Sequence, residues 1–146
     1  MEERRYRLAP VRDARERAEA IRRGDLVDAL DDARATETSL ATARDRTQFA
    51  RDALVAAIAA HATLVTTSPP AARLVAAERF VARRRHELIE RQATELRAEL
   101  AHGARLGDVE TARGTLGRAR AEREVIERHF ARWRDTQRKL RERRDD

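Results

Sequence analysis

The sequence predicts an all-α protein, a long antiparallel two-helix coiled-coil hairpin, from three observations. Charged residues make up 40% of the 146 residues and aromatic residues 3%, a composition typical of long helices and coiled coils. Apolar residues recur at heptad spacing along most of the chain. No proline lies between Pro10 and the adjacent pair Pro69-Pro70, and none follows that pair. Because proline disrupts helices, we expect a helix at about 10–65, a turn at 66–70 and a helix at about 71–143, in one coiled-coil domain spanning 1–146.

Two other arrangements would also explain parts of this pattern. So many charges suit a disordered chain, but here both signs are interleaved with Leu, Ile and Val at helical spacing, which favours ordered helix. A parallel homodimer of a single bent helix would be equally rich in helix. Two long helices on one short connection bury their apolar stripes most simply by folding back on each other, so we favour the hairpin.

The first helix begins at Pro10, whose missing N–H is no loss in a first helical turn. Its first apolar residues are Val11, Ala14, Ala18 and Ile21, and we expect Gly24-Asp25 to interrupt their phase. Two heptad registers follow, one with Leu26, Ala33, Leu40, Thr47, Leu54 and His61, the other with Ala29, Thr36, Ala43, Ala50, Ala57 and Leu64. So many alanines and threonines predict a thin seam that allows close approach.

The second helix starts near Pro70 with Leu74, Val81 and Leu88 in one register. We expect its phase to slip there, with the seam continuing through Ile89, Leu96 and Leu100, and a softer middle at Gly103, Gly107 and Gly114. Beyond it, one register holds Val109, Leu116, Arg123, Phe130 and Gln137, and the other holds Ala112, Ala119, Ile126, Trp133 and Leu140.

The second helix is expected to outrun the first. At 1.5 Å per residue the helices measure about 85 and 110 Å, so Pro10 would lie opposite Arg128 and about 18 residues would overhang. That overhang carries Phe130, Trp133 and Leu140, for which we expect no partner within the chain. It is also basic, because residues 128–144 contain eight basic residues and only two acids.

Several functional classes find no support in the sequence. The chain has no cysteine, and its four histidines are far apart, so we expect no metal and no cofactor. No phosphate-binding loop and no catalytic group of residues is visible, which predicts a protein that is not an enzyme. No signal peptide and no apolar stretch of membrane-spanning length is present, which predicts a soluble cytoplasmic protein.

Two clusters are candidate binding sites. The basic C-terminal stretch can be a solvated helix face, a nucleic-acid site or a protein-docking site. Its Phe and Trp favour the protein partner, and the interleaved acids make nucleic acid the weaker interpretation. The second cluster is Phe80 beside Arg83-Arg84-Arg85, where Phe80 is either a wider core contact or an exposed docking residue.

Three segments resemble the FliJ/YscO family, the coiled-coil stalk proteins of flagellar and virulence type III secretion systems. Residues 6–13 (YRLAPVRD), followed by 15–19 (RERAE), are similar to the start of the family's first helix. Residues 73–81 (RLVAAERFV), continuing to 86–88 (HEL), resemble the segment with a Phe just past the mid-chain turn. Residues 124–134 (EVIERHFARWR) resemble the family's late stretch of glutamate, apolar and basic residues.

The resemblance implies a non-enzymatic stalk or adaptor, cytoplasmic and peripheral to a membrane-embedded secretion apparatus. Members of the family form a long antiparallel coiled coil, insert into the ring of the hexameric export ATPase and contact the cytoplasmic domain of the export gate; some also bind export chaperones. The gate contact carries over to Phe80, Arg84, Glu87 and Arg91.

We expect the end bearing the termini, rather than the turn, to enter the ATPase, because its overhang is basic and aromatic. The residues expected to bind there are Arg128, Phe130, Arg132, Trp133, Arg134, Arg138, Lys139 and Arg141. An arginine-rich nucleic-acid-binding coiled coil and a plain structural spacer remain the alternatives.

Overall fold

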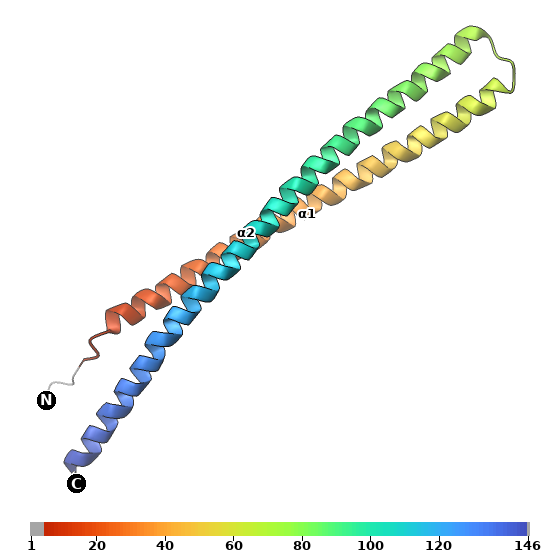
Figure 1. Cartoon of the computed structure of the whole chain (residues 1–146). Helices are drawn as coiled ribbons and strands as arrows, with labels where there is room; N and C mark the ends of the chain where they lie inside the picture. Colours follow the sequence, from red (N-terminus) through yellow and green to blue (C-terminus); the bar gives the residue numbers. More distant parts are fainter. Residues whose placement is uncertain (1–4, 146) are drawn as a thin grey trace. The chain divides into compact units, whose positions relative to one another are not determined.

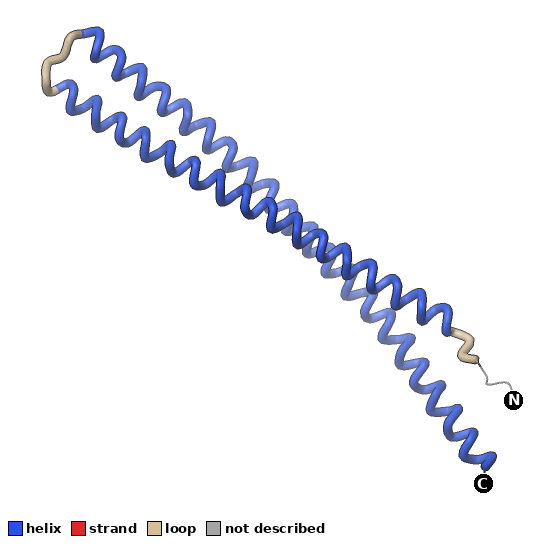
Figure 2. The backbone as a smooth tube through the Cα atoms, turned by 180° about the vertical axis from the view of Figure 1, so that it is seen from behind, coloured by secondary structure: helices blue, strands red, loops and turns tan. Residues whose placement is uncertain are grey.

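The protein folds into two long helices that pack against each other, as the sequence predicts. A computed structural model describes residues 5–145, which contain helix α1 (Ala9–Val65) and helix α2 (Ala71–Asp145) joined by one turn (Figure 1). Outside the helices, the described chain comprises only the short segment before α1 and the turn (Figure 2). The fold class is therefore an all-α helical hairpin.

The turn ends one helix and starts the next through local hydrogen bonds. The hydroxyl groups of Thr66 and Thr67 donate to the carbonyl groups of Thr63 and Leu64, at 2.6 and 2.8 Å, and so satisfy acceptors at the end of α1. Ser68 then adopts a φ of 50°, in the left-handed region, which stops the helical path. The α2 helix follows Pro70, whose carbonyl accepts from the amide of Arg73 at 2.9 Å.

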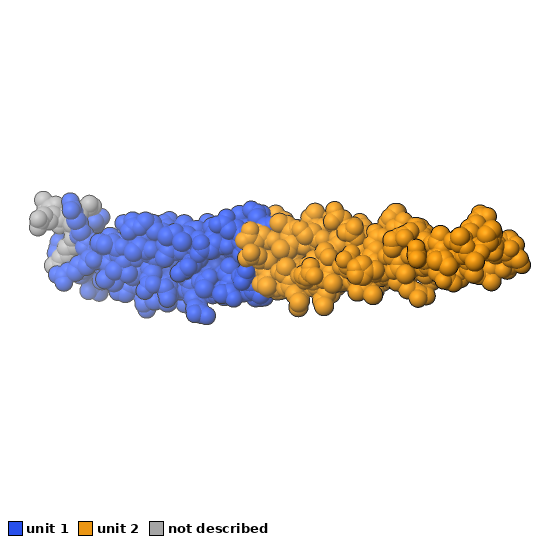
Figure 3. Space-filling model, turned by 90° about the horizontal axis from the view of Figure 1, so that it is seen from above, with its two compact units in different colours: residues 1–31, 107–146 blue, residues 32–106 orange. Residues whose placement is uncertain are grey.

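The hairpin consists of two compact units (Figure 3). Each helix contributes residues to both units. We call residues 32–106, which include the turn, the turn unit. The terminal unit contains the described residues of 1–31 and 107–146.

In the turn unit the buried core is formed mostly by small residues of α1. Thr47 and Ala50 are almost fully buried, and the Thr47 hydroxyl donates to the Ala43 carbonyl at 3.0 Å. Ala33, Leu40, Ala43 and Ala57 complete this side, while α2 adds buried Val81 and half-buried Leu74 and Leu88. The thin seam predicted for α1 is therefore confirmed.

The predicted phase slip in α2 is wrong. Ile89, Leu96 and Leu100 are 62%, 56% and 68% exposed. The seam instead keeps one register as far as buried Val109. Its half-buried members before that point are Arg84, Leu88, Arg91, Glu95, Ala98 and His102. Glu95 and His102 are held there by contacts with α1, Glu95 at 3.9 Å from Arg44 and His102 at 3.0 Å from the Thr36 hydroxyl. The long side chains can cover the alanines of α1 while their charged ends remain near water.

In the terminal unit the core has larger residues on α2. Val109, Leu116, Ala119 and Ile126 are buried, at the positions that the sequence predicts. On α1 the prediction holds only at half-buried Ala18, because Val11, Ala14 and Ile21 are exposed. The seam passes instead through Arg12, Glu19 and Leu26 at seven-residue intervals. Gly24-Asp25 therefore interrupts neither the helix nor its register. Within residues 5–145, neither helix contains a segment long and apolar enough to cross a membrane.

Candidate functional site

The strongest candidate site is an aromatic cluster near the chain termini, in the terminal unit. Tyr6, which precedes α1 and is buried, packs its ring 5.0 Å from that of Phe130 and 5.2 Å from that of Trp133. The Tyr6 hydroxyl shares a 2.7 Å hydrogen bond with Nδ1 of His129. Phe130 and Trp133 stack on each other at 5.8 Å. These contacts attach the start of the chain to the late part of α2.

This cluster corrects the prediction that Phe130 and Trp133 have no partner within the chain. The prediction compared helix lengths only and left out the residues before α1, where a turn closed by the Ala9 amide donating to the Tyr6 carbonyl at 3.1 Å precedes the helix. Tyr6 was missed as a functional residue. The signal that could have revealed it is a lone Tyr shortly before the start of the helix. Leu140, the third predicted apolar residue, is 38% exposed.

Arginines surround the rings of the cluster. The guanidinium of Arg12 lies 4.5 Å from the centre of the Phe130 ring, and that of Arg134 lies 5.8 Å from it, both within cation–π range. Arg12 also donates to Glu127 at 2.7 Å, and this hydrogen bond raises the pKa of Arg12. Arg12 therefore helps to hold α1 on α2, whereas Arg134 lies on the outer side of the cluster.

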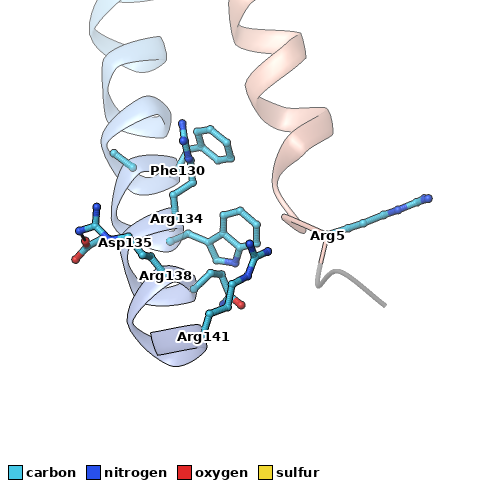
Figure 4. Close-up of a pocket in the computed structure, with 9 residues that line it drawn as sticks. Arg5, Phe130, Arg134, Asp135, Arg138 and Arg141 are labelled. Atoms are coloured by element: carbon cyan, nitrogen blue, oxygen red, sulfur yellow. Dashed lines mark hydrogen bonds and ion pairs between the residues drawn. The ribbon is translucent and has the colours of Figure 1, made fainter. Parts of the chain in front are cut away.

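A hollow of about 730 Å³ adjoins the cluster and is lined by Phe130, Trp133, Arg134, Arg138 and Arg141, with Arg5 at its edge. Figure 4 shows Phe130 on the side of α2 that faces the start of α1, whereas Asp135 lies on another side and the Arg5 side chain points away. The hollow is open rather than enclosed, and arginines and two aromatic rings make up most of its lining. It suits the side chains of a protein partner better than a small molecule.

The cations predicted to bind a partner, between Arg128 and Arg141, differ in whether they form ion pairs within the chain. Arg128 pairs with Glu124, while Arg138 and Lys139 lie 2.5 and 2.8 Å from Asp135, whose pKa is lowered chiefly by the hydrogen bond from Lys139. Arg132 and Arg134, in contrast, form no ion pair with any described residue. Both are exposed, so their positive charge is available to a partner.

An ion-pair network holds the helices together within the same unit. Glu19 is 5% exposed and accepts from Arg123 at 3.0 Å and from Arg23 at 2.7 Å, with Arg120 at 3.7 Å. The Arg123 hydrogen bond is the main cause that lowers the pKa of Glu19, and the same bond raises the pKa of Arg123. This network is structural, because it occupies the seam.

The second candidate site, around Phe80, lies in the turn unit. Phe80 is 40% exposed, and the guanidinium groups of Arg83 and Arg84 lie 5.6 and 5.0 Å from its ring centre. Arg84 also donates to Glu87 at 2.7 Å. The structure thus brings together three of the four predicted gate residues. The fourth, Arg91, is half-buried in the seam seven residues after Arg84.

The described residues contain no group of three His, Cys, Asp or Glu that could hold a metal ion. The chemistry available at both sites is cation–π contact, ion pairing and apolar contact, which is the chemistry of protein recognition. Comparisons with protein-family models, with curated proteins and with solved structures find no match to this chain.

Proposed function

We propose that this protein is a non-enzymatic stalk or adaptor of a type III secretion or flagellar export apparatus, cytoplasmic and peripheral to its membrane-embedded part. The proposal is supported by the three sequence segments that resemble the FliJ/YscO family. It is also supported by the helical hairpin, which is the fold that this resemblance implies. The observation that carries it is the terminal cluster, which consists of Phe130, Trp133 and Arg134, whose guanidinium lies 5.8 Å from the Phe130 ring centre, together with exposed Arg132, the sequence neighbour of Trp133. In a plain spacer the rings would serve only to attach the start of the chain to α2, whereas the cations beside them, which form no ion pair with any described residue, suit a partner.

In this proposal the terminal cluster enters the ring of a hexameric export ATPase. An acidic ring lumen would attract Arg132 and Arg134, and this attraction would raise the association rate. Because salt screens charges, the attraction should weaken as the salt concentration increases. Phe130 and Trp133 would then supply apolar contact, as aromatic residues do at binding hot spots.

The export gate is the second proposed partner, and export chaperones are a further one. Phe80 offers a partly exposed ring, and Arg84 and Glu87 offer charges of both signs beside it. Because Phe80 is only partly buried, replacement by Ala should weaken gate binding more than it destabilises the fold. Loss of the fold itself would assign Phe80 to the core.

Stimulation of a hexameric export ATPase by the purified chain tests the function. The double variant Arg132→Gln/Arg134→Gln keeps every described ion pair and should lose most of the stimulation, and the loss should be larger at low salt. The matched control Arg17→Gln/Arg118→Gln removes two other exposed arginines of the terminal unit and should stimulate like the unmodified chain.

Equal stimulation by both double variants would refute the role of the terminal cluster. Salt-dependent binding to duplex DNA without any effect on the ATPase would favour the arginine-rich nucleic-acid-binding alternative.

A further inference from the structure

We propose that the turn unit carries a surface for a second copy of this chain, where α2 packs antiparallel against α2 of the partner. The surface is a stripe of apolar and small residues on the outer side of α2, which we call the outer stripe. It contains Ala82, Ile89, Ala93, Leu96, Leu100 and Gly103.

The outer stripe has the spacing of a coiled-coil seam. From Ile89 its members follow at intervals of four, three, four and three residues, the alternation that keeps side chains on one side of a helix. Its three large members are all more than half exposed, so nothing in the described chain covers them. Monomeric proteins seldom leave a contiguous apolar stripe in water unless it serves a contact.

The stripe is separate from the seam of the hairpin. The contacts of Glu95 with Arg44 and of His102 with Thr36 show which side of α2 faces α1, and that side carries Leu88 and Ala98. Thus α2 has two heptad stripes in the turn unit, and only one of them has a partner among residues 5–145.

Charges beside the stripe identify the partner and its direction. If two copies of α2 pack antiparallel with Ala93 facing Ala93, residues whose numbers add to about 186 lie opposite each other. Ile89 then lies beside the second copy's Leu96. On one flank Arg85 faces the second copy's Glu99, and on the other Glu90 faces the second copy's Arg97.

Two-fold symmetry doubles these pairs, so four Arg–Glu ion pairs flank one apolar seam. A parallel pair would instead place Arg85 beside the second copy's Glu90, but it would leave Arg97 beside Gln92 and Glu99 beside Ala104, so only two ion pairs would form. Within the chain Glu90 lies 3.2 Å from His86 and Glu99 lies 3.1 Å from Arg44, but a carboxylate has acceptor capacity for a second donor.

Small residues at both ends of the stripe allow the helices to approach, because Ala82 meets the second copy's Gly103. The stripe extends for about 32 Å along α2 and has only three large apolar residues per copy. We therefore expect a reversible dimer that forms with rising concentration rather than an obligate one. None of the residues proposed to bind the ATPase or the gate takes part, so the inference does not depend on the proposed function.

The molecular mass of the full chain as a function of concentration, measured by sedimentation, tests the dimer. The mass should rise from one copy towards two. Leu96→Glu should keep it at one copy, because the variant places a carboxylate in the seam. The control Phe49→Glu changes a large apolar residue of α1 that is 70% exposed, and it should dimerise like the unmodified chain.

Single cysteines test the direction, since the natural chain contains none. Ala93→Cys should form an intermolecular disulfide rapidly, because this position meets itself at the two-fold axis. Ala82→Cys lies on the same stripe but far from the axis and should not. Arg97→Glu should weaken the dimer, and Glu90→Arg/Arg97→Glu should restore it.

A one-copy mass at every concentration, with no cross-link at Ala93→Cys, would overturn the dimer. Equal cross-linking at Ala82→Cys and Ala93→Cys would indicate a parallel pair and overturn the proposed surface.

Discussion

The two units share one heptad repeat but fill it differently. In the terminal unit the seam holds large apolar residues of α2, an aromatic cluster around Tyr6 and the buried carboxylate of Glu19 with its arginines. In the turn unit α1 contributes mostly Ala and Thr, and half the seam of α2 is Arg, Glu and His. The terminal unit thus depends on contacts of large side chains, whereas the turn unit depends on small residues of α1 packed beneath long side chains of α2.

This difference teaches that the heptad position, not the residue type, decides which side of a helix is buried here. Arg84, Arg91 and Glu95 occupy the seam because it continues at seven-residue intervals, and Ile89 and Leu96 are left outside for the same reason. The apolar residues outside the seam then become available for contacts with other chains.

The largest expected effect is the loss of a large core residue in the terminal unit. Leu116→Ala should lower the free energy of unfolding by about 2–5 kcal/mol, because Leu116 is buried and its removal leaves a cavity. Leu96→Ala, in the turn unit, should change it by less than about 0.5 kcal/mol. Urea denaturation at low protein concentration measures both, and similar losses would show that the two leucines are equally buried.

The narrow seam of the turn unit should reject larger residues. Ala50→Leu should destabilise by about 1–3 kcal/mol despite the added apolar surface, because Ala50 is almost fully buried between the helices. The control Ala56→Leu, at an exposed position of α1, should be nearly neutral in the same thermal melts. Stabilisation by Ala50→Leu would mean that the helices are not closely packed there.

The aromatic cluster predicts a smaller effect in the terminal unit. Tyr6→Phe should cost about 0.5–1.5 kcal/mol, because it removes the hydrogen bond to His129 and keeps the ring contacts. Tyr6→Ala should also shift the fluorescence of Trp133, the only tryptophan, to longer wavelength as water reaches the indole. An unchanged spectrum would place Tyr6 away from Trp133.

The smallest expected effect is on the pH dependence of stability. The folded pKa of Glu19 is lowered, so its ion pairs stabilise the fold above the unfolded pKa of about 4.3 and lose that contribution as the pH falls through the folded pKa. Glu19→Gln should therefore flatten the acid side of the stability curve. Glu110→Gln, which removes an exposed pair with Arg113, is the control and should change the curve less.

The elements themselves could be predicted from the sequence, because prolines act locally. The pair Pro69-Pro70 was sufficient to place both helices and the turn between them. The seam could be predicted where it is apolar, as at Leu40, Val109 and Leu116. The prediction of the seam failed where charged residues occupy its heptad positions, because the apolar residues there, such as Ile89 and Leu96, belong to the outer stripe instead.

The candidate sites were predictable in part, for a related reason. Phe130, Trp133 and the nearby arginines stand out by composition, and Phe80 by its arginine neighbours. The contacts of Tyr6 could not be predicted, since its partners are more than a hundred residues away in the sequence. Tyr6 also precedes the first helix, and only the helices were aligned to decide which residues lie opposite each other.

One measurement tests the uninterrupted seam most directly, namely intramolecular disulfide formation in double-cysteine variants. Thr36 contacts His102, so one turn further along each helix Leu40 should face Ala98. Leu40→Cys/Ala98→Cys should therefore form an intramolecular disulfide readily, and Leu40→Cys/Leu96→Cys should not. The reverse result, with the cysteine at 96 reacting and the one at 98 remaining free, would contradict the single register and restore the phase slip.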